Sequence, residues 1–394
     1  MIMIGASVAL VAIGCASTPH PQTRAHRAAK QTPAQHARTC STAPPPTGAT
    51  GSGWSLAHYD FHHTYLDMAA TPSGSLWVVG RYWPEVCGRT TDQPLVLRGD
   101  GKGEWTRVPA PELPDSFASR IAAVSDDDVW LFGDSGQAHW NGSTWTVTSS
   151  DGARFGRPYT DAKNIWIIEG ANILSGAGGA ESGPWQAMGV LRRWNGSTWR
   201  KEWTPVTPAS VSDGWIAGSS HRNAALARRS GGVWRAVPIP AVPTVHKGQF
   251  SRLEDVTVDA SGRVSAIGWI AWVCGGEEED VDYCGRGLFL HGVPGRWSYT
   301  LRDDPSFDAY GPIEADPAGG VWILYSKNDF VESYVRVMGT KWTFGDFPRG
   351  PLGNTRIGHL VSVRATGAMW AAGSDATEAE EPPYKGGAIW RWAP

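Results

Sequence analysis

A short apolar segment recurs seven times along the chain, at intervals of roughly 50 residues. Trp occupies the same landmark position in six copies, and Ser265 occupies it in the other. Short apolar runs bounded by Gly, Pro and Asp predict strands, and helical periodicity is nearly absent. The copies are GSLWVVG (74–80), DDVWLFG (127–133), KNIWIIE (163–169), SDGWIAG (212–218), GRVSAIG (262–268), GGVWILY (319–325) and TGAMWAAG (366–373).

Each copy belongs to a unit of four predicted strands. An apolar run such as YLDMAA (65–70) or TPASVS (207–212) precedes the copy, and two strand-like runs follow it, as in PLVLRGDGKGEWTRVPAP (94–111). Four-stranded units repeated every 40 to 50 residues or so are typical of propeller blades. The sequence therefore predicts an all-β fold, a seven-bladed β-propeller whose strands a to d run from a central channel outward.

The two ends of the repeat region are complementary. The seventh unit ends with GGAIWRWAP (386–394), which supplies strand c but no strand d. GSGWSLAHYD (51–60) has the form of a strand d, with Trp directly after a Gly turn. We expect this N-terminal strand to complete the last blade and close the ring, which leaves no open sheet edge. The predicted propeller covers residues 53–394.

Residues 1–14 have the character of a signal peptide. They are uncharged and mostly apolar, and the run is shorter than the roughly 20 residues needed to span a bilayer. A small residue before Cys15 resembles the lipobox of bacterial lipoproteins, which implies lipidation of Cys15. The alternative is an ordinary secretory signal followed by an incidental Cys.

Residues 15–52 are rich in Ala, Thr, Pro, His and Gln, a composition that favours a disordered tether. We therefore expect an exported bacterial protein that is held to the cell envelope, at the outer membrane or cell surface, by its lipid alone. A secreted protein is the alternative.

The charge and the tryptophan content of the chain indicate which kinds of partner it could bind. The net charge is −3 with both signs interspersed, which gives no electrostatic case for nucleic acid. The 22 tryptophans follow the repeat rather than a random distribution. We expect a monomer whose partner is a protein or a glycan.

Four cysteines follow Cys15, and an even number in an exported chain suggests two disulfides out of three possible pairings. Cys274 and Cys284 close a short loop, so we pair them, which leaves Cys40 with Cys87. The clustered spacing of a zinc site is absent.

The loop between Cys274 and Cys284 is acidic. Its carboxylates could hold Ca²⁺, although a charge run is more often a solvated face, and we predict no other cofactor. The acidic residues are Glu277, Glu278, Glu279, Asp280 and Asp282.

The segment WNGSTW occurs at 140–145 and again at 194–199. Asn-Gly favours a tight turn with positive φ, so we place both copies at hairpins between strands c and d, as scaffold rather than as modification sites. NGSTW resembles the second half of an Asp-box, and the kelch Gly-Gly pair is partly present. Over residues 53–394 the chain resembles the bacterial galactose-oxidase-like, kelch and Asp-box propellers.

Catalytic motifs are weak. GDSGQ (133–137) resembles a serine protease segment but lacks its second Gly, and it falls on a predicted turn. A galactose-oxidase-like copper site needs a free Cys, which two disulfides would not leave. His58, His62 and His63 could bind a metal only if they converged with a carboxylate, and surface positions are the simpler interpretation.

Connection lengths predict a binding face. The a–b and c–d turns are short, whereas the b–c connections of blades 1, 3, 5 and 7 are long (81–93, 171–187, 269–286 and 374–386). Because strands alternate in direction, the b–c and d–a connections share one end of the propeller, the long-loop face. The a–b and c–d turns share the other end, the tight-turn face.

Long loops on a rigid scaffold commonly carry binding residues, and aromatic side chains are favoured at such sites. The aromatic candidates on the long-loop face are Tyr82, Trp83, Trp185, Trp272, Tyr283 and Tyr384, with Trp269 assignable to either the loop or strand b.

Two functions from different classes fit these patterns. The first is a non-catalytic binding or scaffold module for a protein or glycan. The second is a carbohydrate-active hydrolase or lyase with its site at the channel mouth. Three or more converging charged residues at the mouth would favour the enzyme, and small residues such as Ala69, Ala122 and Ser210 would favour the binding module.

Overall fold

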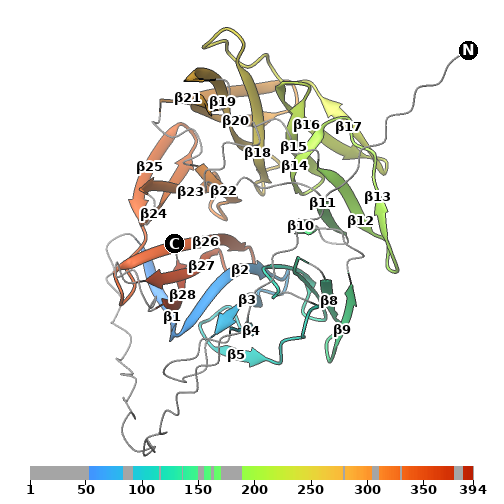
Figure 1. The fold of residues 1–394 in the computed structure, drawn as a ribbon, viewed down its shortest axis with the longest axis vertical. Coiled ribbons are helices and arrows are strands. Elements are labelled where there is room, and N and C mark those ends of the chain that lie inside the picture. The colour runs from blue at the N-terminus through green and yellow to red at the C-terminus, as the bar shows by residue number, and fades with distance from the viewer. Residues whose placement is uncertain are drawn as a thin grey trace, which may run out of the picture. The chain divides into compact units, whose positions relative to one another are not determined.

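The computed structural model describes residues 53–82, 92–114, 117–134, 136–149, 155–160, 164–169, 189–277, 280–303, 310–328, 331–376 and 385–393. Over these residues every regular element is a strand, and the strands form seven four-stranded antiparallel sheets. The sheets are the blades of one ring (Figure 1), which confirms the predicted seven-bladed β-propeller. No helix of the described residues has the length and apolar character needed to cross a membrane.

Each blade has four strands, which follow one another from the centre of the ring outward. Blade 1 contains β2 (His63–Ala70), β3 (Leu76–Tyr82), β4 (Gln93–Gly99) and β5 (Trp105–Val108). Blade 2 contains β6 (Arg120–Ser125), β7 (Asp128–Phe132), β8 (Gly136–Trp140) and β9 (Trp145–Ser149). Blade 3 contains β10 (Phe155–Thr160), β11 (Ile165–Glu169), β12 (Val190–Trp194) and β13 (Trp199–Lys201). Blade 4 contains β14 (Thr207–Ser212), β15 (Trp215–Ser220), β16 (Asn223–Ser230) and β17 (Val233–Val237).

The remaining blades follow the same order. Blade 5 contains β18 (Phe250–Val258), β19 (Val264–Glu277), β20 (Asp280–Val293) and β21 (Arg296–Arg302). Blade 6 contains β22 (Tyr310–Ala315), β23 (Val321–Asn328), β24 (Val331–Met338) and β25 (Lys341–Asp346). Blade 7 contains β26 (Asn354–Val363), β27 (Ala368–Ala376), β28 (Lys385–Trp392) and β1 (Trp54–Phe61).

The landmark tryptophans lie between neighbouring blades. Trp77 packs with Val129 and Leu131 of blade 2, and the other five landmark tryptophans likewise pack on the blade that follows their own. Blade 5 has Ser265 at this position, and there Phe289 contacts Trp342 of blade 6 instead, with ring centroids 5.2 Å apart. The repeat is therefore a repeat of inter-blade packing, because each large apolar side chain removed from water contributes about 1.5–3 kcal/mol.

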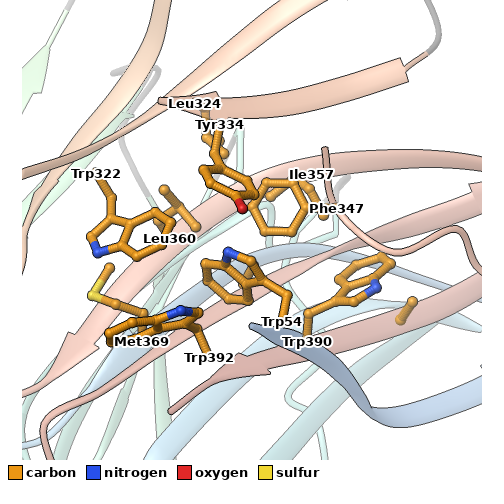
Figure 2. Close-up of a cluster of buried hydrophobic side chains, with 12 residues drawn as sticks. Trp54, Trp322, Leu324, Tyr334, Phe347, Ile357, Leu360, Met369, Trp390 and Trp392 are labelled. Atoms are coloured by element: carbon orange, nitrogen blue, oxygen red, sulfur yellow. The ribbon is translucent and has the colours of Figure 1, made fainter. Parts of the chain in front are cut away.

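The N-terminal strand β1 forms the outer strand of blade 7. It pairs with β28 from Trp54 opposite Trp392 to Phe61 opposite Gly386. The fully buried Trp54 side chain contacts Trp322 edge-on at 5.4 Å and Phe347 at 4.7 Å (Figure 2). Trp54 thus joins the first described strand to blades 6 and 7 at once.

Two aspartates on inner strands tie consecutive blades together. Asp67 accepts hydrogen bonds from the backbone N–H of Met68 and from that of Ile121 in blade 2, both at 3.0 Å. It also pairs with His359 of blade 7 at 3.0 Å. Both backbone groups belong to inner edge strands, where no further strand can satisfy them, so the buried carboxylate takes that role.

Asp255 repeats this arrangement in blade 5. It accepts from the N–H of Val256 at 2.9 Å, from the N–H of Ile313 in blade 6 at 3.1 Å, and from the Ser210 hydroxyl of blade 4. Asp67 and Asp255 are each less than a tenth exposed. Each carboxylate therefore links three consecutive blades near the middle of the ring.

The two WNGSTW copies form the predicted hairpins. In the first, the Asn141 side-chain oxygen accepts hydrogen bonds from the N–H groups of Ser143 and Thr144, and Gly142 has a positive φ of 94°. The flanking Trp140 and Trp145 face each other with centroids 5.2 Å apart. The second copy repeats these contacts around Asn195, so both segments act as turns of the scaffold.

Candidate functional site

Part of the predicted site falls outside the described residues. This applies to Cys15, Cys40, Cys87, Trp83, Trp185, Tyr384, Glu278 and Glu279, and to the side chains of Glu277 and Asp280. The described candidates are Tyr82, Trp272, Tyr283 and Asp282, together with the Cys274–Cys284 pair.

The long connection of blade 5 is a β-hairpin, not the loop expected over 269–286. Strands β19 and β20 stay paired from Val264 opposite Gly292 to Glu277 opposite Asp280. The run WIAWV (269–273) is rich in strand-forming residues, so the blade pairing simply continues beyond the body of the sheet. Cys274 and Cys284 form a disulfide across this hairpin, with Cα atoms 5.6 Å apart.

The aromatic candidates of this hairpin have defined neighbours. Trp272 stacks on His246 with centroids 5.4 Å apart, and Tyr283 meets Phe250 edge-on at 6.1 Å. Trp272 and Tyr283 are half-buried. Both residues are therefore partly exposed on the hairpin of the long-loop face.

Trp269 belongs to strand β19, where it meets two charged side chains. The Nε of Arg252 lies 3.1 Å from Oε1 of Glu254. The indole Nε1 of Trp269 donates a hydrogen bond to the same Oε1 at 3.0 Å. We call Arg252, Glu254 and Trp269 the blade-5 trio.

Local strand geometry brings the blade-5 trio together. Arg252 and Trp269 lie opposite each other in the β18–β19 ladder. Glu254 is the extra residue where the register shifts between Leu253 and Asp255. Such a bulge turns one side chain away from the usual alternation, which lets Glu254 reach both partners.

The Glu254 carboxyl is enclosed but still reaches water. Burial is the largest influence and raises its pKa, and the neighbouring Arg252 and Trp269 offset this only in part. Its side chain nevertheless remains 40% exposed, while that of Arg252 is 12% exposed. The carboxylate is thus surrounded by protein with one side open to solvent.

At the tight-turn face, an ion pair crosses the ring. Arg364, in the a–b turn of blade 7, forms a 3.0 Å ion pair with Asp213, in the a–b turn of blade 4. Blades 4 and 7 are not neighbours, so this contact crosses the middle of the ring at the tight-turn face. The blade-5 trio lies at the other end, because strand a of each blade begins at the long-loop face.

Two of the three histidines at the junction of blades 7 and 1, His58 and His63, have hydrogen-bond partners within the same segment. His58 and Asp60 form a 2.8 Å hydrogen bond, and the Tyr65 hydroxyl donates to the same carboxylate oxygen at 2.9 Å. Burial raises the pKa of Asp60, but the contacts with His58, His63 and Tyr65 outweigh it and lower the pKa overall.

Tyr82 also has close neighbours in this region. It stacks on His63 at 5.7 Å and lies under the Arg107 guanidinium at 3.8 Å. No group of three or more His, Cys, Asp or Glu in the described part of the chain is arranged to hold a metal ion.

The small residues expected at the channel mouth lie elsewhere. Ala122 is buried between blades 2 and 3, Ala69 packs against the interface of blades 1 and 2, and the fully buried Ser210 donates to Asp255. The side chains that do meet at the inner rim of blade 5 are Arg252 and Glu254, which sequence reasoning missed. The available signal was an Arg and a Glu two residues apart at the start of a predicted inner strand.

Comparisons with known proteins support the fold. No protein-family model matches this sequence, and no curated protein matches it significantly. The solved structure of YCF48 bound to D1 peptide is similar to this protein, with a TM-score of 0.50 and 11% sequence identity. The match covers 88% of this chain and 99% of that one.

Two further structures share the propeller fold at lower similarity. An α-L-arabinanase of Penicillium chrysogenum has a TM-score of 0.40 and 10% identity, over 88% of this chain and 98% of its own. The fucose-specific lectin of Aleuria aurantia has a TM-score of 0.37 and 12% identity, over 72% of this chain and 95% of its own. Likeness at these identities shows the fold alone.

Proposed function

We propose that this protein is a non-catalytic binding module that recognises a protein or glycan through its long-loop face. The observation that carries the proposal is the disulfide-closed β19–β20 hairpin, which holds Trp272 and Tyr283 partly exposed beside the blade-5 trio. A rigid strand pair presenting aromatic side chains loses little conformational entropy on binding. On the tight-turn face, the side chains of Asp100, Asn141 and Asn195 are already hydrogen-bonded within their own turns.

A carbohydrate-active hydrolase or lyase is the second candidate. The feature in its favour is the raised pKa of Glu254, since a catalytic acid needs such a shift. Glycoside hydrolysis normally uses two carboxyl groups flanking the scissile bond. The charged groups that act on Glu254 are Arg252 and Asp255. The Asp255 carboxylate is buried and accepts hydrogen bonds from Val256, Ile313 and Ser210, so it serves the ring rather than a substrate, which favours binding over hydrolysis.

Shortening the hairpin tests the proposal. Residues 272–284 are replaced by Asn-Gly, which joins the paired residues Ala271 and Gly285 by a two-residue turn. Full-length variant and wild type are compared on oligosaccharide and peptide arrays, with Lys102→Glu on the tight-turn face as control. We expect the shortened variant to lose ligands that wild type and control retain. Equal binding by all three would refute a role for the hairpin in recognition.

We also propose that Cys15 is lipidated and anchors the protein to the bacterial envelope. A Cys15→Ser variant is then expected to move from the membrane fraction to the soluble fraction, and unchanged fractionation would contradict the proposal.

Three expectations from the sequence stay predictions. They are the pairing of Cys40 with Cys87, the binding of Ca²⁺ by the acidic residues between Cys274 and Cys284, and kinship with galactose-oxidase-like or kelch propellers.

A further inference from the structure

We infer that the blade-5 trio is a subsite for an uncharged saccharide with two adjacent hydroxyl groups. This inference rests on the proposed binding function and specifies its ligand class. It starts from the unused hydrogen-bonding capacity of Arg252 and Glu254. Arg252 and Trp269 both contact the same carboxylate oxygen of Glu254, Oε1.

The second oxygen of Glu254, Oε2, has no hydrogen-bond partner among the described residues, and neither do the terminal Nη atoms of Arg252. A carboxylate only accepts hydrogen bonds and a guanidinium only donates them. The pair therefore presents an acceptor directly beside a donor. A ligand that satisfies both must itself carry a donor and an acceptor side by side, as two adjacent hydroxyl groups do.

Charge excludes ionic ligands from this position. Arg252 and Glu254 neutralise each other, so an incoming anion meets the Glu254 carboxylate and an incoming cation meets the Arg252 guanidinium. Uronic acids, phosphates and amines thus gain from one group and lose to the other. An uncharged polar ligand incurs neither repulsion.

The third member of the trio supplies an apolar surface. Trp269 is partly exposed, and its position is fixed by the hydrogen bond to Glu254 and by edge-on contact with Phe250 at 5.1 Å. An indole presents a wide apolar face together with a polar edge. The C–H face of a sugar ring can cover the indole while its hydroxyl edge reaches Arg252 and Glu254.

A peptide amide also carries a donor beside an acceptor, and the structure favours the saccharide over it. Recognition of an extended peptide uses a row of backbone groups along a free strand edge. At the inner edges of blades 5 and 6 the N–H groups of Val256 and Ile313 are already bound by Asp255. One donor–acceptor pair beside one indole is the smaller site expected for a sugar ring.

The test uses the full-length protein and an array of uncharged oligosaccharides of glucose, galactose and mannose, with uronic-acid and amino-sugar oligomers and a peptide panel. We expect binding to be confined to uncharged saccharides. Calorimetry on the best of these should show at least a tenfold loss of affinity for Glu254→Leu and for Arg252→Thr, because hydrogen bonds to charged groups are lost. Removing either of the two recognised hydroxyls from the saccharide should have a similar effect.

Trp203 provides a matched control. It is 73% exposed in the β13–β14 connection and belongs to no contact of the trio. Trp203→Ala should bind like wild type, and circular dichroism and urea unfolding establish that each variant is folded. If no uncharged saccharide binds, or if folded trio variants bind as wild type does, the inference is wrong.

The array separates this inference from the broader proposal. Binding of peptides alone, abolished by shortening the hairpin, would overturn the saccharide subsite and leave the binding function intact. Binding that survives hairpin shortening and depends on the trio would refute the hairpin's role and support the subsite.

Discussion

Blades 1 and 5 share one backbone design and differ in the chemistry placed on it. In both, an inner-strand aspartate, Asp67 or Asp255, joins three consecutive blades. In both, the inner strand carries a bulge immediately before that aspartate. A strand-b glycine then allows close approach, because a Cβ at Gly80 or Gly268 would overlap a carbonyl oxygen of the inner strand.

The three positions around the bulge differ between the two blades. Blade 1 has Thr64 and Leu66 on its inner strand, and Arg81 faces Thr64 across the ladder. Blade 5 has Arg252, Glu254 and Trp269 in the same places. Because the surrounding backbone is the same, this comparison separates residues that build the ring from the residues that we propose contact a ligand.

Removing the shared aspartate should lower the free energy of unfolding more than any other change proposed here. The loss should be similar in blade 1 and in blade 5. Asp255→Ala leaves the buried N–H groups of Val256 and Ile313 without an acceptor, which should cost about 2–5 kcal/mol of unfolding free energy. Asp67→Ala should cost about as much. Urea unfolding measures both, with Asp127→Ala, an exposed residue in the β6–β7 turn, as control. A loss below about 1 kcal/mol for Asp255→Ala would contradict its bridging role.

Substituting the strand-b glycine should have an intermediate effect on stability and should distinguish the blades by function. Gly80→Ala and Gly268→Ala each force strands a and b apart and should cost about 1–3 kcal/mol. The inner-strand carbonyl that must move in blade 5 is that of Arg252, so Gly268→Ala should also weaken ligand binding. Gly275→Ala, where the added Cβ meets only the side chain of Asp282, is the control. Equal binding by the two blade variants would argue against the trio.

The smallest effect should come from neutralising Glu254. Since burial raises the pKa of Glu254, the native state holds that proton more tightly than the unfolded state, and ionisation costs native stability. Glu254→Gln should therefore match wild type well below pH 4.5 and become the more stable protein as pH rises above it. The exposed side of the carboxyl limits the gain to less than about 1 kcal/mol.

Leu66→Gln, at the matching position of blade 1, should show no such pH dependence relative to wild type. Thermal unfolding between about pH 3 and pH 8 measures both variants. If the stability difference between Glu254→Gln and wild type stays constant with pH, the raised pKa of the Glu254 carboxyl is contradicted.

The repeat made the fold predictable from sequence, because each landmark Trp marks the same packing contact between blades. The Asn-Gly turns and the strand d at the N-terminus were predictable for the same reason. The blade-5 trio was not, since Glu254 meets Arg252 and Trp269 only through a bulge, and a bulge depends on pairing register rather than on apolar pattern. The prediction of a loop over 269–286 was wrong, because a long connection that is rich in strand-forming residues can continue the pairing of the two strands it joins.

The pairing of β1 also places the start of the propeller at one end of the ring. Trp54 lies opposite Trp392 at the tight-turn face, so the chain enters the ring there, and β1 then runs to the long-loop face. The blade-5 hairpin extends from the other end of the ring. The strand that closes the propeller therefore begins at the end opposite the proposed binding face, so the ring is closed without using any part of that face.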